Sequence, residues 1–262
     1  MYPRLLHIYG PLWIQSYGAM IAIGFLVFLY FSSRDPLRKK LISQEAYLNT
    51  VFVGLVSAVI GGRLLYILTH VDEFAGRWIE TVYPWTGGLV VLGAIVGVLV
   101  GVTTYLRINR VPVLPLFDLG ALYAPLMQSI ARFGCLFAGC CYGAYAPHLW
   151  WAITFTNPDG YAPLYAPLHP TQIYMSLISL GIFVVLKMLA SHLLTRPGTM
   201  LATFLMLENL ARFTIDFWRG DRETLVAGLC GTKLSYFQYL SLAGFVLSGG
   251  LLIALLIRDK KR

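Results

Sequence analysis

The chain has 262 residues, of which 58% are hydrophobic and only 12% are charged. Soluble globular domains carry about 25% charged residues, so this composition excludes an ordinary soluble protein and indicates an integral membrane protein. The net charge of +8 is better explained by membrane topology than by nucleic-acid binding, so we expect no nucleic-acid partner. The four cysteines are too few and too clustered for a disulfide framework; they are Cys135, Cys140, Cys141 and Cys230.

Seven apolar segments of about the length needed to cross a bilayer follow one another along the chain. They are Tyr17–Phe31, Tyr47–Leu68, Gly88–Leu106, Leu116–Phe137, Gln172–Leu189, Thr199–Phe217 and Leu234–Ile257. The gaps between them are short, so residues 1–262 are expected to form a single all-α transmembrane domain. The fourth segment is unusual because it carries Asp118, Pro125 and Arg132.

The distribution of basic residues predicts the orientation. Twelve lysines and arginines lie on one predicted side and five on the other, which places the C-terminus in the cytoplasm. With seven spans the N-terminus is then outside, as is the long loop 141–171. The first residues lack the basic region, apolar run and cleavage site of a signal peptide, so we expect none to be removed.

Small residues recur every four positions in the second and third segments. They are Gly54, Ala58 and Gly62, and then Gly93, Gly97 and Gly101. Such spacing lets two helices approach closely in lipid, so these two segments are expected to pack against each other.

Six ionisable residues fall inside or at the ends of the apolar segments: Arg63, Asp118, Arg132, Glu208, Arg212 and Asp216. Charges at lipid depth face a protein interior or a wet cavity, and they are candidates for function. A structural alternative is that they form ion pairs that cross-link helices, which is favoured for Asp118 and Asp216. Glu208, Arg212 and Asp216 are spaced by four and so form one charged stripe along a helix.

Arginine suits an anionic lipid headgroup because its planar guanidinium meets two phosphate oxygens at once. Arg132 opens the stretch 131–143, which continues through Cys135 to the adjacent Cys140 and Cys141. A snorkelling anchor is the alternative for Arg132. The cysteines can be small buried residues, a metal site or a reactive thiol near Arg132. Their spacing matches no common zinc pattern, so no metal site is assigned.

One histidine lies in a recognisable pattern, His169 to Tyr174, which reads His-Pro-Thr-Gln-Ile-Tyr. Pro170 is suited to the first turn of the fifth helix, and Thr171 or His169 to its cap. This interpretation as a helix start explains the motif without chemistry.

These blocks, in this order, resemble the prolipoprotein diacylglyceryl transferase family from the first helix to the last. The blocks are Tyr17-Gly18-Ala19-Met20, Gly61-Gly62-Arg63, Gly87-Gly88-Leu89 with Gly93, Asp118, Arg132-Phe133-Gly134, His169 to Tyr174, Arg212-Phe213, Asp216 to Arg219, and Gln238. The Gly-Cys-Cys-Tyr-Gly sequence at 139–143 marks a divergent subgroup.

The resemblance implies transfer of a diacylglyceryl group from phosphatidylglycerol to the lipobox cysteine thiol of a preprolipoprotein, with glycerol phosphate leaving and no cofactor. It implies that Arg132 binds the phosphate, that Arg212 is at the catalytic centre and that Tyr17 lies near it. Arg63 is a second candidate for the phosphate. The implied location is the bacterial inner membrane, with the site open to the outer leaflet.

The chain departs from the family pattern at several positions. A histidine usual in the family is Leu92 here, an asparagine is Cys135, and a glutamate is Cys140. A glutamate common after the histidine motif is Met175, and a tyrosine before Arg212 is Glu208. If the missing histidine is the general base, Glu208 is the nearest replacement, although an adjacent arginine weakens a carboxylate as a base. A bound hydroxide and the phosphate itself are the alternatives.

Two other hypotheses remain open on the sequence. One is a catalytically altered relative that binds phospholipid or lipoprotein precursors without transfer, suggested by Leu92. The other is a transporter or channel, suggested by the charged stripe, although the chain shows no internal repeat.

Overall fold

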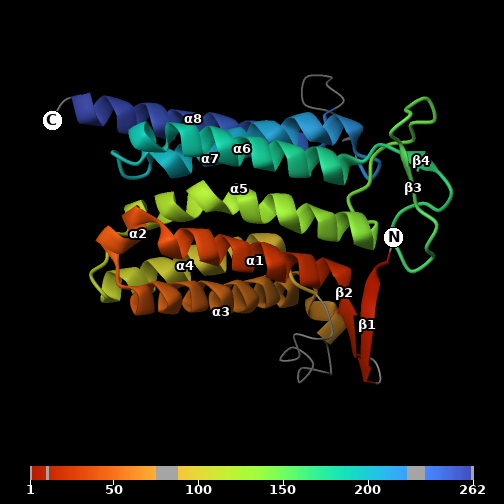
Figure 1. The fold of residues 1–262 in the computed structure, drawn as a ribbon, viewed down its shortest axis with the longest axis horizontal. Coiled ribbons are helices and arrows are strands. Elements are labelled where there is room, and N and C mark those ends of the chain that lie inside the picture. The colour runs from red at the N-terminus through yellow and green to blue at the C-terminus, as the bar shows by residue number, and fades with distance from the viewer. Residues whose placement is uncertain (1, 10–11, 75–87, 223–233, 261–262) are drawn as a thin grey trace. The chain divides into compact units, whose positions relative to one another are not determined.

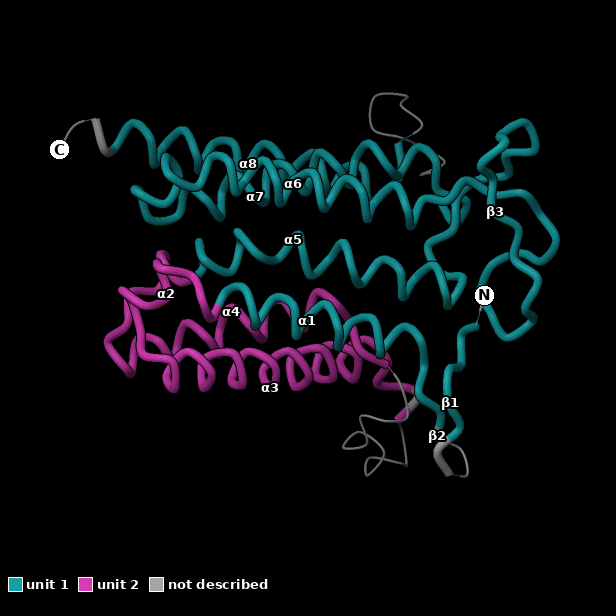
Figure 2. The backbone as a smooth tube through the Cα atoms, viewed as in Figure 1, with its two compact units in different colours: residues 1–32, 117–262 teal, residues 33–116 magenta. Residues whose placement is uncertain are grey.

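A computed structural model describes residues 2–9, 12–74, 88–222 and 234–260. The chain forms two compact units, residues 1–32 with 117–262 and residues 33–116 (Figure 2). Six described helices are long and apolar enough to cross a membrane, which confirms the all-α membrane class. They are α1 (Ser16–Arg34), α3 (Gln44–Thr69), α4 (Val91–Ile108), α5 (Val113–Ala138), α6 (Thr171–Leu193) and α8 (Tyr236–Lys260) (Figure 1).

A shorter helix takes the place of the sixth predicted segment. This helix, α7 (Thr199–Ile215), has 17 residues and continues into a single 3-10 turn, η4 (Asp216–Trp218). Seventeen residues is the lower limit for a span, so the count of seven spans and the orientation of the termini stay predictions. The fourth predicted segment is one unbroken helix, α5, despite Pro125 within it.

Two short antiparallel strand pairs lie outside the helices, and neither was predicted from the sequence. Strand β1 (Arg4–Tyr9) pairs with β2 (Leu12–Gln15) ahead of α1. Strand β3 (Ile153–Thr154) pairs with β4 (Pro167–Leu168) in the loop between α5 and α6. These pairs are only two to six residues long, too short for an alternating pattern to stand out in the sequence.

The unit of residues 33–116 is a helical hairpin preceded by the short helix α2 (Pro36–Leu41) and containing the turn η1 (Val71–Phe74). Helices α3 and α4 pack closely through glycines, as predicted. A Cβ atom on Gly97 would overlap the backbone oxygen of Ser57, and one on Gly93 would overlap that of Gly61. The closest approach on α3 is therefore made by Ser57 and Gly61 rather than by Ala58 and Gly62.

Helix α5 is the most buried of the six long helices. A Cβ atom on Gly24 of α1 would lie 2.8 Å from the backbone oxygen of Met127 on α5. Ser176 of α6 donates a 2.8 Å hydrogen bond to the backbone oxygen of Ser129. Because both contacts are made by small residues, α1 and α6 come near to the backbone of α5.

Asp118 of α5 has a structural role. Its carboxylate is buried and accepts hydrogen bonds from the backbone nitrogens of Gly198, at 2.5 Å, and Leu201, at 2.8 Å. These nitrogens lie at the start of α7, where the first N–H groups of a helix have no partner inside the helix. Asp118 therefore caps α7 from another helix. Asp118 thus links two helices, but the predicted ion pair is wrong, because backbone N–H groups are its partners.

We predict that Asp118→Ala lowers the free energy of unfolding by about 1–3 kcal/mol, because it leaves buried N–H donors without an acceptor. Asp118→Asn keeps one acceptor oxygen and is expected to lose less. Thermal unfolding of the purified protein in detergent measures both. Glu45→Ala, at an exposed acid in the first turn of α3, is the control, expected to change stability by less than about 0.5 kcal/mol. Equal unfolding midpoints for wild type and Asp118→Ala would contradict the capping role.

Candidate functional site

A buried carboxylate organises the end of α7. Asp216 is 1% exposed. It forms ion pairs with Arg212, at 3.9 Å, and Arg222, at 3.7 Å, and accepts a hydrogen bond from the hydroxyl of Ser235. Gln238, at the start of α8, accepts a 2.7 Å hydrogen bond from Arg222. This network fixes where Arg212 and Arg222 lie, and it confirms the predicted pairing of Arg212 with Asp216.

The guanidinium group of Arg212 keeps a second contact beside the ion pair, 5.1 Å from the ring centre of Phe237. Cation–π contact stabilises the charge without occupying the N–H donors that a phosphate would use. One weak ion pair and one aromatic face therefore hold Arg212 in place while leaving it hydrogen-bonding capacity.

Arg132 lies where α5 approaches the start of α1. The helices are close because Gly134 has no side chain: a Cβ atom there would be 3.1 Å from the Cα atom of Tyr17. Tyr17 interacts electrostatically with Arg132, so the two predicted site residues are neighbours. Among the residues that the structure describes, no carboxylate forms an ion pair with Arg132.

The end of α5 has the backbone pattern of a Schellman motif. The nitrogen of Gly139 donates to the oxygen of Leu136, at 3.3 Å, and the nitrogen of Cys140 to that of Cys135, at 3.1 Å. Gly139 has a φ of +77°, the left-handed conformation that glycine adopts without a steric penalty. Because this motif brings the residue after the turn back to the last helical turn, it places Cys140 next to Cys135.

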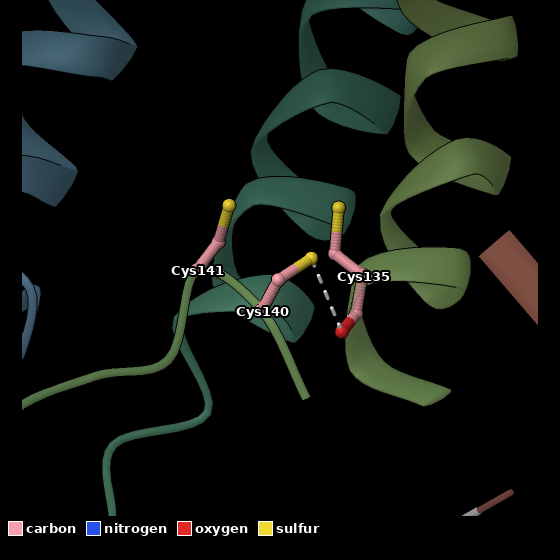
Figure 3. A group of neighbouring side chains, drawn as sticks. All are labelled: Cys135, Cys140 and Cys141. Carbon is pink, nitrogen blue, oxygen red and sulfur yellow. Dashed lines mark hydrogen bonds between the residues drawn. The ribbon is translucent and has the colours of Figure 1, made fainter. Parts of the chain in front are cut away.

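The thiols form a cluster with Cys141, whose φ is +57°. Figure 3 shows Cys135 on the end of α5 and the other two residues on the loop that follows, with the thiol of Cys140 donating to the backbone oxygen of Cys135, at 3.8 Å. A non-glycine residue in the left-handed region is strained by about 1–3 kcal/mol and persists only where the surroundings hold it. The loop is therefore held in place by its neighbours.

Those neighbours come from the start of α6. Thr171 donates a 2.7 Å hydrogen bond to the backbone oxygen of Cys141, and Gln172 donates one of 2.9 Å to that of Cys140. The predicted cap of α6 is wrong, because Pro170 occupies the cap position and no side chain caps the helix. The motif at 169–174 instead ties the cysteine loop to α6.

The same loop also contacts the end of α7. The nitrogen of Ala144 donates to the oxygen of Trp218, at 2.8 Å, and the nitrogen of Gly220 to that of Tyr142, at 3.0 Å. These two bonds flank Arg219, whose side chain donates to Asp221, at 2.8 Å. The backbone pairing brings Arg219 beside the cysteine loop.

The positive charges and the thiols of these elements interact. Arg212 feels the charges of Arg219 and Arg132. Hydrogen bonds with the thiols of Cys135 and Cys140 lower the pKa of the Cys141 thiol, as do the charges of Arg219 and Arg132, while burial opposes them. The same thiol hydrogen bonds raise the pKa of Cys140. Three guanidinium groups near one another form an environment that attracts an anion.

The remaining predicted site residues have other partners. Glu208 accepts a 2.5 Å hydrogen bond from Gln128 of α5, and its other carboxylate oxygen is buried without a hydrogen-bond partner among the described residues. Arg63 belongs to the unit of residues 33–116, where it donates to the backbone oxygen of Gly88, at 3.4 Å. Leu92, in the same unit, is 63% exposed. Gly87 of the paired glycines lies outside the described residues.

Sequence reasoning missed three side chains of this site. Thr171 and Gln172 appeared only as parts of a helix start, and Arg219 only as an outer basic residue. The signal for Arg219 was its place directly after Asp216-Phe217-Trp218, in one of the quoted blocks. Nothing in the spacing of 171 and 172 from 140 and 141 indicates their contact.

Comparison with known proteins identifies the family of the chain. The model of the family described as Prolipoprotein diacylglyceryl transferase matches residues 3–254. The phosphatidylglycerol–prolipoprotein diacylglyceryl transferase of Clostridium tetani is 31% identical over 92% of this chain and 93% of the relative. The relative called phosphatidylglycerol–prolipoprotein diacylglyceryl transferase 2, from Clostridium perfringens, is 32% identical over 92% and 90%. The chain therefore belongs to the prolipoprotein diacylglyceryl transferase family.

Proposed function

We propose that this protein transfers the diacylglyceryl group of phosphatidylglycerol to the lipobox cysteine thiol of a preprolipoprotein. A thioether forms and glycerol phosphate leaves, which is the first step of lipoprotein maturation. We place the protein in the bacterial inner membrane as a multi-pass protein, with its site open to the outer leaflet. The single observation that carries the proposal is that Arg212, held by the buried Asp216, interacts electrostatically with both Arg132 and Arg219 in a chain of this family.

The charge of the site suits the leaving group. The four guanidinium groups of the site outnumber its three carboxylates, so positive charge is in excess; the groups are those of Arg132, Arg212, Arg219 and Arg222, with Asp216, Asp221 and Glu208. The phosphodiester of phosphatidylglycerol carries one negative charge, and a second develops as the glyceryl carbon–oxygen bond breaks. Fixed cations stabilise the developing charge more than the ground state, which lowers the barrier.

Within this proposal Arg132 and Arg212 hold the phosphate, and Tyr17 lies beside them at the catalytic centre. Arg132 suits the first contact because no described carboxylate pairs with it. Arg63 remains a proposed further phosphate ligand. Glu208 is the proposed base for the substrate thiol, since one of its carboxylate oxygens is buried without a hydrogen-bond partner among the described residues.

We predict that Arg132→Ala lowers transfer from labelled phosphatidylglycerol to a lipobox peptide by about 100-fold or more, the usual effect of removing one donor to a developing oxyanion. Arg132→Lys keeps the charge but loses the two-point contact, so it is expected to retain more activity. Arg107→Ala, at an exposed arginine at the end of α4, is the matched control and should transfer normally. Full activity of Arg132→Ala would remove Arg132 from the phosphate site.

We predict that Glu208→Gln lowers the rate by about 10²–10⁴-fold and abolishes the acidic limb of its pH profile. The wild-type rate should fall as the pH is lowered, because a protonated carboxylate accepts no proton. Glutamine keeps the size of the side chain and its hydrogen bond with Gln128, so packing is preserved. An unchanged acidic limb in Glu208→Gln would show that another group is the base.

Complementation separates transfer from binding alone. We expect the wild-type gene to rescue a bacterium depleted of its own diacylglyceryl transferase, and the Arg132→Ala and Arg212→Ala variants to fail at equal expression. Failure of the wild type, with phosphatidylglycerol still bound by the purified protein, would instead identify a relative that binds lipid without transfer.

A further inference from the structure

The proposed transfer reaction leaves the three clustered thiols without a role, because the attacking sulfur belongs to the substrate. The sulfur atoms of Cys135, Cys140 and Cys141 all lie within 4.8 Å of one another. The Schellman turn at Gly139 brings the first two together, and hydrogen bonds from α6 hold the loop that carries the third. The backbone therefore imposes this grouping of thiols (Figure 3).

The spacing fits a metal ion with sulfur ligands. A Zn–S bond is about 2.3 Å, so sulfurs around a tetrahedral ion lie about 3.8 Å apart. The three sulfur atoms lie within 4.8 Å of one another. Small side-chain rotations that move each sulfur by a fraction of an ångström would bring them to the separation of about 3.8 Å. Thiolates select soft or borderline cations such as Zn²⁺ over Mg²⁺ and Ca²⁺. Three protein ligands with an open fourth position are typical of catalytic rather than structural zinc.

The surroundings favour such an ion in two ways. Three thiolates with Zn²⁺ carry one net negative charge, and Cys141 interacts with the charges of Arg219, Arg132 and Arg212. In addition, Gln172 is 2% exposed and its amide oxygen has no hydrogen-bond partner among the described residues. Its amide nitrogen is only 2.9 Å from the backbone oxygen of Cys140. An unsatisfied acceptor therefore lies close to the thiols, where a water bound to the metal can donate to it.

We propose that Cys135, Cys140 and Cys141 bind one Zn²⁺ ion whose fourth coordination position takes the thiol of the lipobox cysteine. The fourth ligand rests on the proposed function; the binding of the ion does not.

The ion answers a difficulty of the transfer reaction. An ordinary thiol gives up its proton to an ordinary carboxylate only to about one part in 10⁴, whereas a thiol on a metal ion is deprotonated outright. The proton leaves the substrate sulfur for Glu208. The sulfur electron pair then forms the bond to the glyceryl carbon, and the pair of the broken carbon–oxygen bond leaves with glycerol phosphate. No oxidant or reductant takes part.

The first experiment measures metal binding alone. The purified full-length protein in detergent is titrated with Cd²⁺, which replaces Zn²⁺ and gives an ultraviolet thiolate band. We expect about one Cd²⁺ per chain. The Cys135→Ser, Cys140→Ser, Cys141→Ser triple variant should lose the band. Cys230→Ser, which changes the cysteine outside the described residues, should retain it. The Cys140→Ser single variant should stay monodisperse and bind Cd²⁺ at least about 10-fold more weakly than wild type. That result excludes misfolding as the cause of weaker metal binding.

Two results overturn the metal site. One is a wild-type protein that binds no Cd²⁺ and contains no zinc as purified. The other is a triple variant with the same band and metal content as wild type.

The second experiment tests the fourth ligand. A lipobox peptide is added to the Cd²⁺-loaded protein without phosphatidylglycerol, so that no transfer occurs. We expect the thiolate band to grow by about one third, from three sulfurs to four, and a peptide with serine in place of cysteine to leave it unchanged. An unchanged band with the cysteine peptide overturns the open position.

The two proposals fail in different ways. Metal binding without any transfer activity would leave the thiol site standing and overturn the proposed function. Normal transfer by a protein stripped of metal would leave the proposed function standing and overturn the role of the metal in activating the substrate thiol.

Discussion

The left-handed turn at Gly139 is the constraint on which the rest of the site depends. It ends α5 about two turns beyond Arg132 and reverses the chain, so that the loop from Cys140 onwards returns to the helix end. A Cβ atom on Gly139 would lie 3.2 Å from the backbone nitrogens of Tyr161 and Ala162. The position therefore has little room for a side chain as well as a left-handed backbone. With the turn in place, the loop meets α6 on one side and the end of α7 on the other, which joins segments far apart in the sequence.

Ion pairs with carboxylates determine where most arginines of the site lie. Asp216 is buried and shared by Arg212 and Arg222, and Asp221 is used by Arg219. Breaking a buried pair by removing one partner is strongly destabilising, since it leaves an uncompensated charge. The carboxylates thus hold the arginines in place but do not balance all of them. Arg132, which pairs with no described carboxylate, supplies part of the excess. The result is a rigid set of cations that is complementary to a phosphate and to the charge that develops on it.

The sequence predicted the helices well because bilayer length and apolar composition are local properties. It also predicted the close packing of α3 and α4 from glycine spacing, and the pairing of Arg212 with Asp216 from a separation of four residues. It failed where structure depends on contacts between distant segments. Asp118 was expected in an ion pair, but it caps α7 some 80 residues later. The clustering of the thiols depends on a positive φ at Cys141 and on Thr171, neither of which leaves a local pattern.

The cationic half and the thiol half of the site both fit the proposed reaction. A phosphodiester is a poor electrophile and a neutral thiol is a poor nucleophile. The transfer therefore requires activation of both the attacking sulfur and the leaving phosphate oxygen. Guanidinium groups act on the leaving oxygen because their charge opposes the charge that accumulates there. Guanidinium groups do not deprotonate a thiol. A guanidinium group next to a carboxylate also makes that carboxylate a weaker base. In the proposed reaction a second device is therefore needed to activate the sulfur, because the arginines proposed to hold the phosphate cannot do so. Arg219 lies at the junction, since it interacts both with Arg212 and with Cys141. An anionic metal–thiolate centre next to these cations would be stabilised by them, so the same excess of positive charge serves both halves of the reaction.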